Sequence, residues 1–66
     1  MIKDRSYFRD YLRGFLVDED DPRKDDEAFI DGRADRAEGV MEDARRNGAT
    51  VNQAEEEAMA VLMDGL

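Results

Sequence analysis

The sequence contains no cysteine and no histidine. Without cysteine the chain can form neither a disulfide bond nor a thiolate metal site. Without histidine it lacks the commonest zinc ligand and the commonest general base. These absences argue against an enzyme, so we expect no catalytic residues, no metal site and no cofactor.

A long apolar run is also missing. A secretory signal needs about 7–15 apolar residues after a basic start, and a membrane-spanning helix needs about 20. No segment approaches either pattern, and charged residues appear within the first few positions. We therefore expect a soluble protein that does not bind membranes. The absence of cysteine fits a reducing compartment, so the expected location is the cytoplasm.

Basic residues are too few to balance the acidic ones. The chain has 10 Lys and Arg residues against 18 Asp and Glu residues, which gives a formal net charge of −8. Such a chain repels phosphate groups and anionic lipids, so we expect no direct contact with nucleic acid. If charge recruits a partner, that partner is a basic protein.

The length of 66 residues leaves room for one domain and one core. A core of this size supplies only about 3–5 kcal/mol, and small domains often add a disulfide, a metal or a partner subunit. A partner subunit is the remaining option in this chain.

Residues 6–17 carry the first periodic pattern. Pairs of apolar residues recur every four positions and therefore share one face of a helix. They are Tyr7/Phe8, Tyr11/Leu12 and Phe15/Leu16. We predict an amphipathic helix over about residues 6–17, in which Gly14 would allow close packing.

Residues 18–27 contain seven carboxylates, one proline and no apolar side chain available for burial. Proline cannot continue a helix, so this segment is predicted to be an acidic loop. Its carboxylates do not match a calcium-binding EF-hand. A loop starting at Asp18 would need glycine where Arg23 stands and glutamate where Phe29 stands. Asp25, Asp26 and Glu27 would instead cap the next helix.

A second helix is predicted over about residues 28–47. Its apolar stripe has alternating four- and three-residue spacing, which is heptad spacing. The stripe consists of Ile30, Ala34, Ala37, Met41 and Ala44. Glu42 could pair with Arg46 one turn later, Gly32 is a point where the helix could fray or bend, and Asn47-Gly48 is a helix stop.

The third helix is predicted over about residues 52–64. Two capping boxes could open it, Thr50 with Gln53 or Asn52 with Glu55, and the sequence does not choose between them. Its apolar face contains Ala54, Ala58, Val61 and Leu62, with Met59 and Met63 beside it.

Together these patterns predict an all-α fold. We expect a single small three-helix domain over residues 1–66, with a hairpin of the second and third helices packed against the aromatic-rich first helix. The turn at residues 47–52 resembles a DNA-binding helix-turn-helix in outline. The third helix has no basic residue to read bases, however, so a plain helical hairpin is the better interpretation.

A protein-protein interaction module is the function that these features favour. The heptad stripe and the aromatic residues of the first helix exceed what two short neighbours readily cover, so we expect a homodimer or a docking module. The alternative is an acidic, DNA-mimic-like inhibitor that binds a basic protein. The candidate interaction surface combines two aromatic residues with the acidic loop: Tyr7, Tyr11, Asp18, Glu19, Asp20 and Asp21.

Several short segments carry a family resemblance. They are Ser6-Tyr7-Phe8, Tyr11-Leu12, Phe29-Ile30, Arg33-Ala34-Asp35-Arg36-Ala37, Ala44-Arg45 with Gly48, Ala54-Glu55, Ala58-Met59-Ala60-Val61-Leu62 and Gly65-Leu66. With them, nearly the whole chain resembles the N-terminal half of a Bacteroides-type family of uncharacterised bacterial proteins, domain of unknown function family 1896. The resemblance implies helical structure and frequent mobile-element gene neighbourhoods, and it carries over no catalytic residue.

Overall fold

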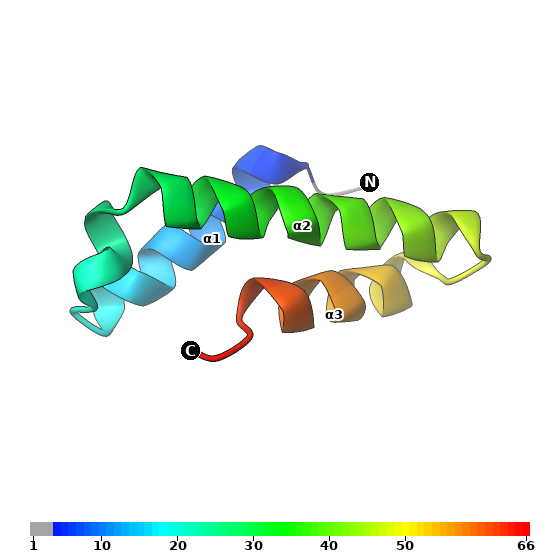
Figure 1. Ribbon diagram of the computed structural model, residues 1–66. Helices are drawn as coiled ribbons and strands as arrows, with labels where there is room; N and C mark the ends of the chain where they lie inside the picture. Colours follow the sequence, from blue (N-terminus) through cyan, green and yellow to red (C-terminus); the bar gives the residue numbers. More distant parts are fainter. Residues whose placement is uncertain (1–3) are drawn as a thin grey trace.

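A computed structural model describes residues 4–66 and shows three α-helices joined by short connections (Figure 1). Helix α1 spans Arg5–Asp18, the 3-10 helix η1 spans Pro22–Asp25, α2 spans Glu27–Arg46 and α3 spans Val51–Leu62. The described residues contain no strand. The predicted all-α, three-helix fold is therefore confirmed.

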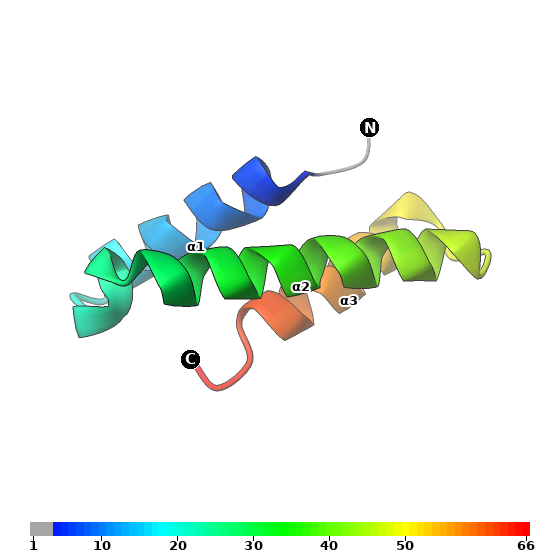
Figure 2. The same cartoon turned by 45° about the horizontal axis from the view of Figure 1, so that its top comes forward.

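Helix α2 is the centre of the molecule. Both other helices pack against it, whereas α1 and α3 barely contact one another. Figure 2 shows α1 and α3 on different sides of the longer α2. The result is an elongated body of 37 × 20 × 17 Å.

The core lies where α1 and α3 meet α2, and ten apolar side chains in it are fully buried. They are Phe8, Leu12, Leu16, Ile30, Ala34, Ala37, Met41, Ala54, Ala58 and Leu62. They recur at three- and four-residue spacing along each helix, which is why one face of each helix is buried. The alanines allow the helix backbones to approach closely.

The heptad stripe of α2 is part of this core. Four of its five residues have no exposed surface, and Ala44 is partly buried against them. The expectation that two short helices could not readily cover this stripe and the aromatic residues of the first helix is therefore wrong for the stripe, while Tyr11 remains 47% exposed. One chain buries the stripe without a second copy, because the small alanine side chains need little cover.

Each α-helix begins at a polar side chain that accepts a main-chain hydrogen bond. Asp4 accepts from the amide of Tyr7 at 3.1 Å, and Asp26 accepts from the amide of Phe29 at 3.1 Å. At the start of α3 the structure contains the first of the two predicted capping boxes, formed by Thr50 and Gln53. The Thr50 hydroxyl accepts from the Gln53 amide, and the Gln53 side chain accepts from the Thr50 amide, both at 3.1 Å.

The acidic segment is more ordered than the predicted loop. It contains η1, which begins at its only proline, because proline is well suited to the first turn of a helix. Asp21 precedes this turn and caps it by accepting from the Arg23 amide at 2.8 Å. Residues 19–21 form the turn out of α1, and Asp20 adopts a positive φ of 52° in it.

Two expectations about glycine are wrong. A side chain at Gly14 would meet nothing within 4 Å, so this glycine does not permit close packing. Helix α2 also continues through Gly32 without a break. Gly48 behaves as expected, because its φ of +95° suits glycine and it follows the end of α2.

None of the helices in residues 4–66 is both long and apolar enough to cross a membrane.

Candidate interaction surface

One exposed face of α1 carries aromatic side chains. Tyr7, Tyr11 and Phe15 are spaced four residues apart, each directly preceding a buried core residue. Tyr11 is 47% exposed, while Tyr7 and Phe15 are partly buried against the core. The Tyr7 ring lies edge-on to Phe8, with centroids 5.5 Å apart, and 6.4 Å from the Tyr11 ring. The face is therefore a row of rings whose inner edges rest on the core.

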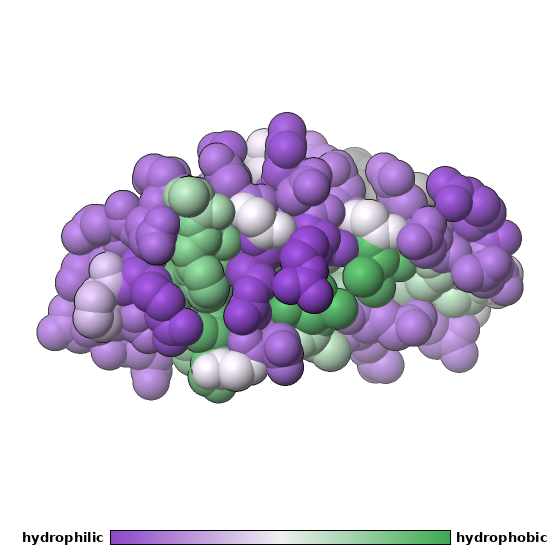
Figure 3. All heavy atoms as spheres, viewed as in Figure 1, coloured by the Kyte–Doolittle hydropathy of each residue, from purple (hydrophilic) through white to green (hydrophobic). Residues whose placement is uncertain are grey.

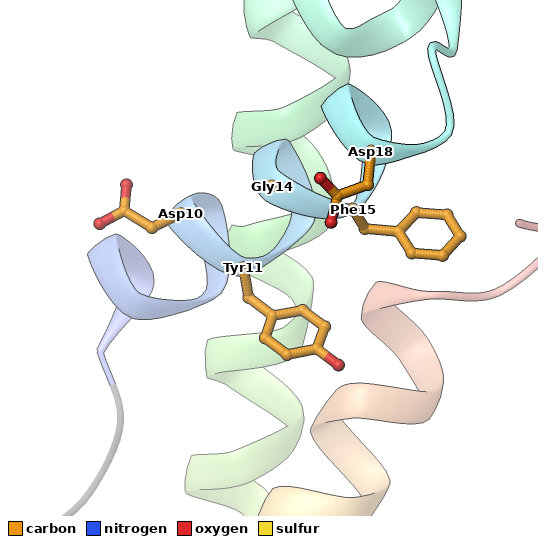
Figure 4. A pocket seen from close by; sticks show the side chains of 5 residues that line it. All are labelled: Asp10, Tyr11, Gly14, Phe15 and Asp18. Carbon is orange, nitrogen blue, oxygen red and sulfur yellow. The ribbon is translucent and has the colours of Figure 1, made fainter.

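An open hollow of about 340 Å³ lies along this row, and Asp10, Tyr11, Gly14, Phe15 and Asp18 line it. Figure 4 shows the Tyr11 and Phe15 rings extending from α1 on the side where α3 runs. The Asp18 carboxylate lies beside Phe15, and Asp10 points away from both rings. Because Gly14 has no side chain, nothing protrudes from α1 between the rings and the two carboxylates.

A second hollow of about 410 Å³ lies on α3, lined by Asn52, Glu55, Glu56 and Met59. Like the first hollow, it combines apolar and acidic side chains, here one methionine and two glutamates. Met59 and Met63 are partly buried against the core. The sequence indicated both methionines beside the apolar stripe but did not include them in the candidate surface.

The two hollows lie beside different halves of α2. Arg13 pairs with Glu27, so the hollow on α1 lies near the start of α2, whereas α3 runs back from the end of α2 and its hollow lies near that end. On α2 the residues that pair with α1, such as Asp31, lie to one side of the core stripe, and Arg36 lies to the other. Arg36 lines a third hollow with Ala60, Val61 and Asp64, so that flank of α3 is turned away from α1. The opposite flank of α3 carries Met59.

Only part of the acidic segment is free to contact a partner. Asp21 accepts from the Arg23 guanidinium at 2.7 and 3.0 Å, and Asp20 accepts from Lys24 Nζ at 2.9 Å. The side-chain and main-chain hydrogen bonds from Arg23 lower the pKa of the Asp21 carboxyl from 3.8 to about 2. Asp18 and Glu19 are exposed. Asp20 and Asp21 therefore stabilise the turn around η1.

Three arginines of α1 pair with carboxylates of α2, a pattern that the sequence analysis missed. Arg13 approaches Glu27 at 2.6 Å, Arg9 approaches Asp31 at 3.3 Å and Arg5 approaches Asp35 at 3.6 Å. Four-residue spacing on both helices was the available signal. Similarly, Arg46 pairs with Asp43 at 3.0 Å and not with Glu42.

Carboxylates do not gather into a cation site. Within residues 4–66, no group of three or more acidic side chains comes close enough to hold a metal ion. On most of the face formed by α2 and α3, hydrophilic side chains separate small hydrophobic areas (Figure 3).

The geometry therefore presents an exposed, ring-lined surface on a small helical scaffold. The sequence profile of a family described as Domain of unknown function (DUF1896) matches residues 2–66. The chain belongs to this family. No curated protein and no solved structure matches it.

In this DUF1896 chain, the six predicted surface residues do not form one continuous patch. Tyr7 and Tyr11 share a face of α1, and Tyr11 and Asp18 both line the hollow. Glu19 lies in the turn after α1, and Asp20 and Asp21 bond to η1. The prediction that these residues contact a partner stays a prediction.

Proposed function

We propose that this DUF1896 domain is a protein-interaction module that binds another protein through the aromatic face of α1. The observation that carries the proposal is Tyr11, which is 47% exposed at the edge of a hollow that also contains Phe15. Tyrosine and other aromatic residues are enriched in protein interfaces, because a rigid ring contributes a large contact area at little entropic cost.

The charge distribution favours a foreign partner over a second copy. A homodimer would bring together two chains that each have a formal net charge of −8. The apolar stripe that suggested self-association is buried within one chain. The carboxylates around the hollow are unpaired. They support a more specific form of this function, in which the domain is an acidic inhibitor that binds a basic protein.

The test is photo-crosslinking in the cells that make the protein. A photoreactive phenylalanine analogue replaces Tyr11 in one variant and Ala28, an exposed residue at the start of α2, in the control variant. We expect Tyr11 to yield one discrete adduct with a different protein and Ala28 to yield none.

Each remaining outcome contradicts the proposal. An adduct of twice the chain mass at Tyr11 would show self-association instead. The absence of any adduct, or the same adduct from both positions, would show that the aromatic face of α1 is not a binding surface.

A further inference from the structure

The turn between α2 and α3 contains the only asparagine-glycine pair of the sequence, Asn47-Gly48. Both residues follow the last residue of α2, and both are exposed (Figure 1). The Asn47 side chain bonds to no other described residue. An unbonded side-chain amide therefore stands directly before a glycine in a surface turn.

An asparagine side chain can be attacked by the main-chain nitrogen of the next residue. In this chain the Gly48 nitrogen would lose its proton to hydroxide and form a bond to Cγ of Asn47. The bond from Cγ to the side-chain nitrogen would break, and this nitrogen would leave as ammonia after taking a proton from water. Water then opens the resulting succinimide ring at either carbonyl, which gives aspartate or isoaspartate. Apart from water and hydroxide, the reaction needs no other reactant.

Gly48 offers little resistance to this attack. It has no side chain to shield its nitrogen, and an added Cβ would meet nothing within 4 Å. Its φ of +95° lies in a region that glycine adopts without strain. Attack requires rotation about ψ of Asn47, which is 8° in the structure. This rotation breaks the 3.1 Å hydrogen bond from the Gly48 amide to the Arg45 carbonyl, at a helix end where fraying is common. Local opening of the turn is therefore enough for the nitrogen to reach Cγ.

Asn52 provides a contrast within the same chain. It is also exposed, but it lies in the first turn of α3. The amide that would attack it belongs to Gln53 and donates to the Thr50 hydroxyl at 3.1 Å. The Gln53 side chain accepts from the Thr50 amide in return, so the capping box holds this main chain in place. The positions of the two asparagines in the fold therefore predict different reactivity.

From these observations we infer that Asn47 is a modification site, at which the chain deamidates without an enzyme and mainly to isoaspartate. Isoaspartate predominates because water attacks the more electrophilic carbonyl of the succinimide, which is the former main-chain carbonyl of Asn47. The inference goes beyond the proposed function and does not depend on it.

The modification would act on the hairpin of α2 and α3. The Ala44 carbonyl accepts hydrogen bonds from the Asn47 amide at 3.2 Å and from the Ala49 amide at 3.0 Å. Isoaspartate adds a methylene group to the main chain between these two donors, so the two bonds cannot both keep their geometry. The new carboxylate also lies at the C-terminal end of α2, where the helix dipole disfavours a negative charge. The modified chain is therefore less stable.

The experiment follows the mass of the full folded chain during incubation at neutral and mildly alkaline pH. Deamidation raises the mass because a carboxyl group replaces an amide. Fragmentation assigns the gain to one residue and distinguishes isoaspartate from aspartate. We expect Asn47 to react at least about tenfold faster than Asn52. We also expect the rate to rise with pH and isoaspartate to exceed aspartate.

Two variants separate the modification from general ageing of the sample. Asn47→Gln keeps a side-chain amide but would have to form a six-membered ring, so its mass and melting temperature should stay constant during the same incubation. Freshly purified Asn47→Asp carries the new charge without the longer main chain. We expect incubated wild-type protein to melt at a lower temperature than either variant.

Several results would overturn the inference. No mass gain at Asn47, or equal rates at Asn47 and Asn52, would show that the turn does not favour the reaction. Aspartate as the main product would show direct hydrolysis in place of attack by Gly48. A melting temperature equal to that of fresh Asn47→Asp would contradict the effect of the longer main chain on the hairpin. Crosslinking at Tyr11 is unaffected by any of these outcomes, so this inference and the proposed function fail separately.

Discussion

Arg33 of α2 donates a hydrogen bond of 2.7 Å from Nη1 to the main-chain carbonyl of Asp64, just beyond the end of α3. The same nitrogen lies 3.2 Å from the carbonyl of Leu62 and 3.4 Å from that of Val61. Val61 and Leu62 belong to the last turn of α3, whose carbonyls lack an intrahelical partner, and Asp64 follows that turn. The Arg33 guanidinium carbon also lies 5.0 Å from the centroid of the Phe29 ring. One side chain of α2 therefore fixes the end of α3.

Replacing Arg33 with methionine keeps much of the apolar stem and removes the donor. We expect Arg33→Met to lower the free energy of unfolding by about 1–2 kcal/mol, because the carbonyls at the end of α3 lose a charged donor. Urea denaturation followed by circular dichroism measures the change. The control is Arg36→Met, since Arg36 has no bonded partner among the described residues, and it should alter stability by less than about 0.5 kcal/mol. Equal losses would argue that only the arginine stems matter.

Thr50 opens α3, and Asn52 is the cap that the sequence left as an alternative. Thr50→Ala removes the acceptor for the Gln53 amide, so we expect the unfolding free energy to fall by about 1 kcal/mol. Thr50→Ser keeps a hydroxyl acceptor and should therefore retain most of the stability that Thr50→Ala loses. Asn52 lies inside the helix, so Asn52→Ala should lower the unfolding free energy by less than about 0.5 kcal/mol. A larger loss at Asn52 than at Thr50 would show that α3 begins later than the structure places it.

Ala58 tests the close packing of α3 against α2. It is fully buried, whereas Ala60 on the same helix is exposed. We expect Ala58→Leu to destabilise the fold by about 1–3 kcal/mol, because the larger side chain forces the helices apart. Ala60→Leu changes the same residue type in the same way and should have almost no effect on the melting temperature. Similar melting temperatures for the two variants would contradict the tight α2–α3 interface.

Asp21 is predicted to make stability depend on pH in the acidic range. Its folded pKa of about 2 lies below the ordinary value of 3.8, because Arg23 holds the charged form. The stabilisation is therefore complete above about pH 4 and is lost as the pH falls toward and through 2. Titrating the carboxyl carbon by NMR measures the pKa directly.

The matched variants for this prediction are Asp21→Asn and Asp25→Asn. Asp21→Asn should lower the melting temperature at pH 7 and reduce the loss of stability between pH 4 and pH 2. Asp25 is exposed and bonds to no described side chain, so its variant should follow the wild-type pH profile. An Asp21 pKa close to 3.8 in the folded chain would contradict the hydrogen bonds around η1.

The local pattern of the sequence determined the helices and much of the core. Three- and four-residue spacing predicted that Leu12, Ile30 and Ala58 would share buried faces, and all three are fully buried. Spacing along one helix is a local property, so it can be read without knowing what the helix packs against. The acidic composition and the helix stop at Gly48 are local in the same sense.

Tertiary structure alone decided which charges meet and where the surface is hollow. Arg33 reaches Asp64, and Arg13 reaches Glu27, only because packing of the alanine-rich core sets the register between helices. The same register places the hollow beside Tyr11 and the hollow beside Met59 along different halves of α2. A helical face can be predicted from its own residues, but its neighbour depends on how side chains from distant segments fit together. The hollow beside Tyr11 could therefore not be predicted from the sequence, although every residue that lines it is visible there.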